Sequence, residues 1–134
     1  MKKALIAIIV IVVGIQFIPV ERSNPLITSE FSAPSDVKQI LKRACYDCHS
    51  NETNWVWYTK IAPASFLASS DVKDGRRHLN FSEWNLDKEA KHKDEIWEEI
   101  QEEQMPPWQY KIFHSESKLS QEEKNIIRNW ASGQ

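Results

Sequence analysis

Two thiols and an imidazole stand together in the stretch Cys45-Tyr46-Asp47-Cys48-His49. Two cysteines three positions apart, followed directly by histidine, have the spacing of covalent haem attachment in exported proteins. On a helical turn Cys45 and Cys48 share one face, so both sulfurs can form thioethers with the vinyl groups on one porphyrin edge. A ring nitrogen of His49 can then reach the iron as its proximal ligand. The spacing therefore predicts one covalently bound haem c.

The same cysteines allow two other interpretations. A Cys45–Cys48 disulfide would suit a thioredoxin-like protein, but this needs strand–helix–strand patterning around the pair, and no strong strand run is found near it. Zinc binding would need a second ligand pair at finger-like spacing, which is also missing from the sequence. Haem attachment is therefore favoured over both.

A second iron ligand is predicted in the stretch that begins with Met105 and continues through Pro106 and Pro107. Two prolines fix the backbone locally, and a stiff loop can hold a thioether sulfur against a metal. We predict Met105 as the distal ligand opposite His49; the alternative role for Met105 is a gap-filling core side chain. Three histidines compete for the distal position: His78, His92 and His114. Of these His78 is the strongest, whereas His92 stands among lysines and is expected to be exposed.

Three further side chains are predicted to contact the cofactor. Arginine pairs with carboxylates in forked geometry, so Arg76 and Arg77 are candidates for the haem propionates, with solvated surface charge as the alternative. The chain has six tryptophans, and flat indoles suit a flat cofactor as well as an ordinary core. Of these, Trp57 is predicted to pack against the porphyrin.

Helices are expected to position this chemistry. Apolar residues recur at helical spacing from Ser35, which can cap the helix, up to Cys45. Residues 55–58 are expected to form a loop on the proximal side, residues 64–70 a short helix, and Gly75 a turn with positive φ. Residues 87–104 form an amphipathic pattern that predicts a further helix. A capping box at Ser120 and Glu123 predicts the start of a last helix, whose apolar face ends at Trp130.

The N-terminus predicts a signal anchor over residues 1–20. Lys2 and Lys3 precede an apolar run from Ala4 to Ile18, interrupted only by Gly14 and Gln16. The run is short for a membrane span of about 20 residues, but no small-residue cleavage site follows, so an anchor in residues 4–20 is favoured over a cleaved signal. The lysines would stay in the cytoplasm and the remainder would be exported.

Composition limits the rest of the chain. Residues 21–34 contain two prolines and several serines, and they are predicted to be a tether between the anchor and a single domain over residues 35–134. A net charge of −2 gives no reason to expect a nucleic-acid partner.

The chain from about Ser35 to Trp130 resembles the bacterial haem-binding domain family of small cytochrome c-like proteins. The resemblance rests on the stretches 45–53, 55–58, 61–63, 75–84 and 105–107. It implies an all-α, class I cytochrome c-like fold wrapped around one haem. It also implies that Cys45 and Cys48 attach the haem, that His49 is the proximal ligand, and that Met105 occupies the position of the distal methionine.

The expected function is that of a monohaem c-type cytochrome, an electron carrier and not an enzyme. It would exchange single electrons with partner proteins in the periplasm or an equivalent extracytoplasmic space, anchored in the inner membrane by residues 4–20. Two alternatives remain open. One is a haem peroxidase-like enzyme with His78 and Arg76 or Arg77 as its distal groups. The other is a gas or redox sensor with a labile Met105.

Overall fold

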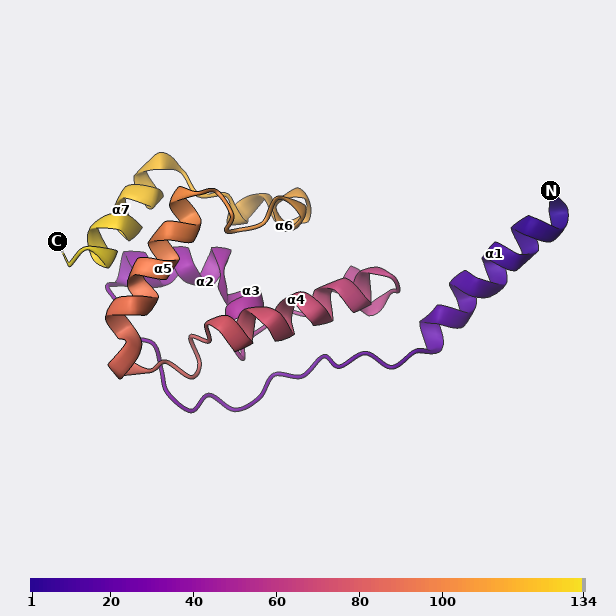
Figure 1. Cartoon of the computed structure of the whole chain (residues 1–134), viewed down its shortest axis with the longest axis horizontal. Helices are drawn as coiled ribbons and strands as arrows, with labels where there is room; N and C mark the ends of the chain where they lie inside the picture. Colours follow the sequence, from indigo (N-terminus) through magenta and orange to yellow (C-terminus); the bar gives the residue numbers. More distant parts are fainter. Residues whose placement is uncertain (134) are drawn as a thin grey trace.

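The computed structural model describes residues 1–133 as a bundle of short helices with one helix projecting from it (Figure 1). The α-helices are α1 (Lys2–Gly14), α2 (Ser35–Ala44), α3 (Tyr46–His49), α4 (Ala64–His78), α5 (Glu89–Gln101), α6 (Trp108–Phe113) and α7 (Gln121–Ala131). The 3₁₀ turns are η1 (Ile15–Phe17), η2 (Trp57–Lys60), η3 (Leu86–Lys88) and η4 (Ser115–Ser117). Within residues 1–133 the β-structure is limited to an isolated bridge between Ser29 and Glu83, so the all-α prediction is confirmed.

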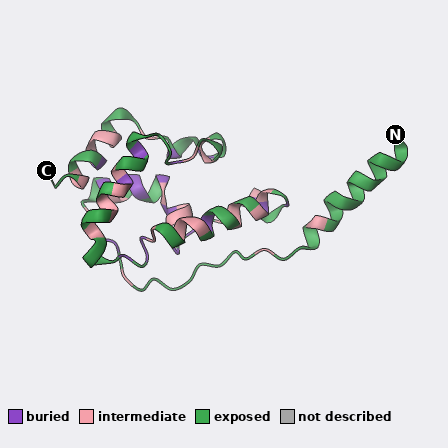
Figure 2. Ribbon diagram, viewed as in Figure 1, coloured by how far each residue is buried: buried purple, intermediate pink, exposed green. Residues whose placement is uncertain are grey.

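The core is centred on α2, α5 and α7. The predicted apolar face of α2 is buried, and Leu41 on it packs with Ile100 of α5 and Ile127 of α7. Figure 2 shows the buried residues gathered where these three helices meet. The predicted capping box is also confirmed, since the Ser120 hydroxyl accepts from the Glu123 N–H and the Glu123 carboxylate accepts from the Ser120 N–H.

An aromatic cluster joins the N-terminal segment to this core. Phe31 is 1% exposed, and its ring centroid lies 4.6 Å from that of Trp84 and 5.0 Å from that of Phe81. The hydroxyl of Ser29 donates to the Trp84 carbonyl at 2.9 Å. The end of the segment predicted as a tether is therefore part of the folded domain. An isolated aromatic residue in an aperiodic stretch gave no sign of this burial.

Helix α4 is twice as long as predicted, because it continues through Gly75 instead of turning there. A Cβ at Gly75 would lie 2.6 Å from the carbonyl oxygen of Cys48, closer than atoms can approach. The glycine therefore serves close packing of α4 on α3, and the predicted positive φ at Gly75 is wrong. The predicted helix over 87–104 is also shorter, because η3 occupies its start and α5 ends at Gln101.

Helix α1 carries no buried residue. Among residues 1–133, no helix is both long enough and apolar enough to cross a membrane. The turn η1 that follows α1 is nevertheless fixed to the domain, because the Gln16 side-chain amide donates to the Ala62 carbonyl at 3.2 Å and accepts from the Ala62 N–H at 3.0 Å. The signal anchor itself stays a prediction.

Candidate haem-attachment site

The two cysteines lie at the junction of α2 and α3. Cys45 breaks the helix with φ −125°, and its carbonyl accepts from the N–H groups of Cys48 at 3.2 Å and His49 at 2.9 Å. Both thiols are free and half-buried. Burial raises the pKa of each thiol to about 12, with the neighbouring Cys48 adding to the shift at Cys45. The motif therefore forms one compact turn that presents two neutral, unlinked thiols.

The imidazole of His49 is held in one orientation. Its Nδ1 lies 3.1 Å from the carbonyl oxygen of Leu79, which can only accept, so Nδ1 carries the proton. Burial lowers the pKa of His49 and favours the neutral ring. The Phe81 N–H donates to the His49 carbonyl at 2.8 Å and fixes the backbone as well. Nε2 is then the unprotonated nitrogen, the form in which histidine binds a metal.

Arg76 is engaged inside the protein. Its guanidinium donates to the Ser50 carbonyl at 2.7 Å and to the Thr53 hydroxyl at 2.9 Å. It also donates to the Ser23 carbonyl at 2.9 Å and to the Asn24 amide oxygen at 3.0 Å. These bonds join α4 to the loop after α3 and to the N-terminal segment. Most of the guanidinium N–H groups of Arg76 that could bind a haem propionate are therefore already bonded within the protein.

Arg77 and Trp57, the other predicted cofactor contacts, are exposed. Arg77 is paired with Asp74 at 3.0 Å on the surface of α4. Trp57 is 72% exposed and lies edge-on to the ring of Tyr58. Neither side chain has a hydrogen bond or a ring contact to His49 among residues 1–133. Both assignments stay predictions from the sequence.

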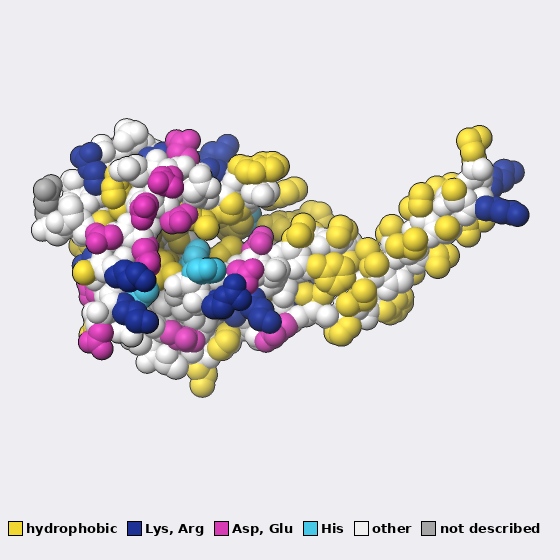
Figure 3. All heavy atoms as spheres, viewed as in Figure 1, with side chains coloured by type: hydrophobic (Ala, Val, Ile, Leu, Met, Phe, Trp, Pro, Cys, Tyr) yellow, Lys and Arg dark blue, Asp and Glu magenta, His cyan; other side chains and the backbone are white. Residues whose placement is uncertain are grey.

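Met105 is 37% exposed and lines a groove of about 580 Å³ with Trp108, Ile112 and Leu119. No residue of the Cys45–His49 motif lines this groove in the described part of the chain. Because α6 follows the proline pair directly, however, the Met105 loop is linked to the motif through contacts of α6. Figure 3 shows hydrophobic side chains gathered around α6 and around the start of α4.

Those contacts of α6 form a polar network that sequence analysis missed. The Tyr110 hydroxyl donates to the Asp47 carboxylate at 2.7 Å, and the rings of Tyr110 and His114 stack with centroids 4.1 Å apart. Glu116 can only accept, so His114 donates to it from Nδ1 at 3.0 Å and accepts at Nε2 from the Tyr58 hydroxyl. The bonds of Tyr110 to Asp47 and of His114 to Tyr58 join residues 63 and 56 positions apart, so no sequence spacing indicates them.

The three competing histidines differ in their surroundings. His114 is buried with both ring nitrogens engaged, and His78 is exposed with Nδ1 bonded to the Asp74 carbonyl at 2.8 Å. The expectation that His92 is exposed is wrong. Its side chain is 14% exposed because it packs beside the Trp84 ring and bonds to Glu95.

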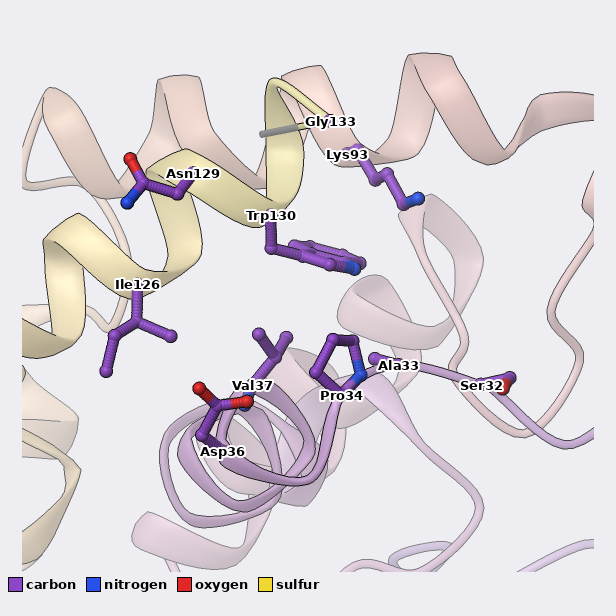
Figure 4. Close-up of a pocket in the computed structure, with 10 residues that line it drawn as sticks. All are labelled: Ser32, Ala33, Pro34, Asp36, Val37, Lys93, Ile126, Asn129, Trp130 and Gly133. Atoms are coloured by element: carbon purple, nitrogen blue, oxygen red, sulfur yellow. The ribbon is translucent and has the colours of Figure 1, made fainter.

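A separate groove of about 640 Å³ lies between α2 and α7. Figure 4 shows the Trp130 indole reaching across it towards Val37 and Pro34. Lys93 of α5 closes the groove from the side of the indole. None of the predicted site residues lines this groove.

The residues of the motif suit a covalent haem. Two free thiols share one turn, and a neutral, oriented imidazole follows them with Nε2 free of a hydrogen-bond partner among the described residues. The absence of a side chain at Gly75 lets α4 pack directly on this turn.

Comparison with known families agrees with this geometry. The model of the haem-binding domain family matches residues 10–133. The chain therefore belongs to this family of haem-binding domains. Neither the curated proteins nor the solved structures contain a significant match to it.

Proposed function

We propose that this haem-binding domain is a monohaem c-type cytochrome that exchanges single electrons at the extracytoplasmic face of a membrane. In this proposal Cys45 and Cys48 hold one haem c through thioethers, His49 is the proximal ligand, and Met105 is the distal ligand. A haem with two protein ligands supplies a one-electron iron couple, and methionine opposite histidine raises its reduction potential.

The observation that carries the proposal is the bond from His49 Nδ1 to the Leu79 carbonyl, beside two free thiols on the same turn. This bond selects the tautomer and the ring direction before any metal arrives. The Phe81 N–H and the close packing of Gly75 hold the backbone of the turn. The chain thereby supplies a pre-oriented ligand, which limits structural change when the iron changes its charge.

The enzymatic alternative has less support. It would place Arg76 or Arg77 beside His78 to stabilise charge, but Arg76 makes its hydrogen bonds to Ser50 and its neighbours and Arg77 pairs with Asp74. The sensor alternative depends on an exchangeable Met105, and the partial exposure of Met105 is compatible with such exchange.

The test is an absorption spectrum of exported, matured protein in both oxidation states, with acid-acetone extraction of the haem. The proposal expects a low-spin spectrum and haem that stays with the protein. Replacing both cysteines by alanine should make the haem extractable, and His49→Ala should remove the low-spin signal while the thioethers remain. High-spin ferric protein that turns over peroxide would favour the enzyme, and ready ferrous binding of carbon monoxide would favour the sensor.

A further inference from the structure

The end of the domain beside α1 carries a group of exposed apolar side chains. They come from the end of η1 and the residue after it, from η2 and the loop between η2 and α4, and from the first turn of α4. The members of this group, called here the apolar collar, are Phe17, Ile18, Trp57, Ile61 and Leu67. Figure 3 shows hydrophobic side chains continuing from α1 onto this end of the domain. Large exposed apolar patches on soluble surfaces mark interaction sites.

The collar is fixed relative to α1. Gln16 makes two hydrogen bonds to the backbone of Ala62, which follows Ile61 directly. Beyond α1, the Arg22 guanidinium donates to the Thr59 carbonyl at 3.4 Å, and the Ser69 hydroxyl donates to the Glu21 carbonyl at 2.7 Å. Residues 21 and 22, which follow η1, are therefore hydrogen-bonded to η2 and α4. These bonds restrict rotation of the domain relative to α1.

The length of the apolar helix sets where the collar lies. Helix α1 has 13 residues and η1 has 3, which together rise about 26 Å. The hydrocarbon core of a bilayer is about 30 Å thick, with polar interfaces beyond it. An anchor of this length that starts at Lys2 and Lys3 would end about 4 Å short of the far boundary of the hydrocarbon, so Phe17, Ile18 and the part of the domain beside them would lie at that boundary.

We infer that the apolar collar lies in the interface of a lipid bilayer, so that the domain contacts the membrane directly and is not held away from it by a flexible tether. This inference rests on the anchoring in the proposed function. The amide of Gln16, the polar group nearest the boundary, is satisfied by Ala62 and Val12 and so carries little desolvation cost. Trp57 supplies an indole, which favours the membrane interface, and Lys60 between it and Ile61 supplies a cation for lipid phosphate.

The test uses full-length, haem-loaded protein in liposomes of phosphatidylcholine and phosphatidylglycerol. Single cysteines are introduced by Leu67→Cys and Ile61→Cys in the collar and by Leu86→Cys as the control. Leu67 and Leu86 are similarly exposed in the structure, at 65% and 73%. Because Cys45 and Cys48 would be held in thioethers, the new thiol is the only one open to a membrane-impermeant sulfonated maleimide.

The inference predicts that Leu67→Cys is alkylated roughly tenfold more slowly than Leu86→Cys in liposomes, because the interface excludes the charged reagent. The Ile61→Cys variant should be protected in the same way and gives a second measurement if Leu67→Cys does not mature. Flotation with the liposomes and equal alkylation rates would overturn the collar and leave the anchor intact. Failure to float would overturn both. If the floated protein carries no covalent haem, the proposed cytochrome is contradicted, and the comparison is repeated with Cys45→Ala and Cys48→Ala so that the introduced thiol is again the only one; slow alkylation of Leu67→Cys there would still support the collar.

Discussion

The Tyr110 hydroxyl donates a 2.7 Å hydrogen bond to Oδ2 of Asp47, a residue between the two cysteines of the Cys45–His49 motif. The other carboxylate oxygen, Oδ1, accepts from the Asn54 N–H at 2.9 Å. One acidic side chain thus ties the motif both to the loop after it and to α6. Since α6 follows Met105, Pro106 and Pro107, this contact connects the two predicted iron ligands through the protein.

Tyr110→Phe should lower the free energy of unfolding by about 1.5–3 kcal/mol, because it removes a bond to a charged acceptor. Burial, together with the bond to Asp47, raises the pKa of Tyr110. Its stabilisation should therefore be complete below the ordinary tyrosine pKa of 10.0 and be lost at higher pH. Denaturant titrations at several pH values would measure this. Covalent haem should be retained, and an unchanged stability would contradict the role assigned to this bond.

Met105→Ala should remove the distal sulfur and convert the low-spin spectrum to one with an open or water-filled position. The reduction potential should fall, since methionine opposite histidine raises it. Spectra and a redox titration measure both effects. His78→Gln is the matched control and should change neither. If the two variants exchange these outcomes, His78 is the ligand and the assignment of Met105 is wrong.

Arg76→Gln should destabilise the fold by about 2 kcal/mol, because its bonds to Ser50, Thr53 and the N-terminal segment are lost. If Arg76 only braces the loop after α3, the haem spectrum and potential should stay unchanged. Arg77→Gln removes a surface pair with Asp74 and should cost no more than about 0.5 kcal/mol. Thermal melts and spectra separate stability from haem contact. A shifted potential with an unchanged melting temperature in either variant would revive the propionate prediction.

Gly75→Ala should be destabilising by about 1–2 kcal/mol, although alanine is the better helix former by about 1 kcal/mol. The added Cβ would fall 2.6 Å from the Cys48 carbonyl oxygen, a backbone atom that cannot easily yield. The yield of covalent haem should fall too, because the attachment turn must move. Gly14→Ala is the control, since nothing lies within 4 Å of a Cβ there. Equal stability of the two variants would refute close packing as the reason for Gly75.

Glu123→Gln should cost about 0.5 kcal/mol, since glutamine can preserve the capping box of α7 but loses the charge that pairs with Arg43 of α2 at 2.6 Å. Partial burial raises the pKa of Glu123. The hydrogen bonds from the Ser120 N–H and from Arg43 lower this pKa by a larger amount, so the net shift is downward from 4.5. The stabilisation is therefore present above pH 4.5 and lost as the pH falls below it. Glu122→Gln should be nearly neutral, and unfolding curves between acid and neutral pH would compare the two.

The sequence predicted the features that depend on residues close together in the chain. This holds for the apolar face of α2, the capping box of α7 and the Cys45–His49 motif, because each depends on residues within one or two helical turns. Spacing on a helix also placed both thiols on one turn, although the break at Cys45 between α2 and α3 was not foreseen. The resemblance to a haem-binding family, which rests on the motif and on stretches 55–58, 61–63, 75–84 and 105–107, is confirmed by the family match over residues 10–133.

The contacts that escaped prediction join distant segments. Nothing near Phe31 shows that it packs against Phe81 and Trp84, and nothing near Arg76 shows that its partners lie after α3. The positive φ predicted for Gly75 is wrong for the same reason. The glycine is required by the nearby carbonyl of Cys48 on another helix, and not by its own backbone angles. Tertiary packing overrides local preference at these positions.

Helix α4 begins within the apolar collar and passes Cys48 at Gly75. The axial rise from Ala64 to Gly75 is about 16 Å, set by 1.5 Å per residue. If the collar lies on lipid, this rigid strut fixes the height of the thiol pair above the bilayer, and adding one helical turn would lift it by at most about 5 Å. An electron donor or acceptor would then need its own redox centre at a similar distance from the membrane surface. This distance, as well as surface complementarity, would select the partner.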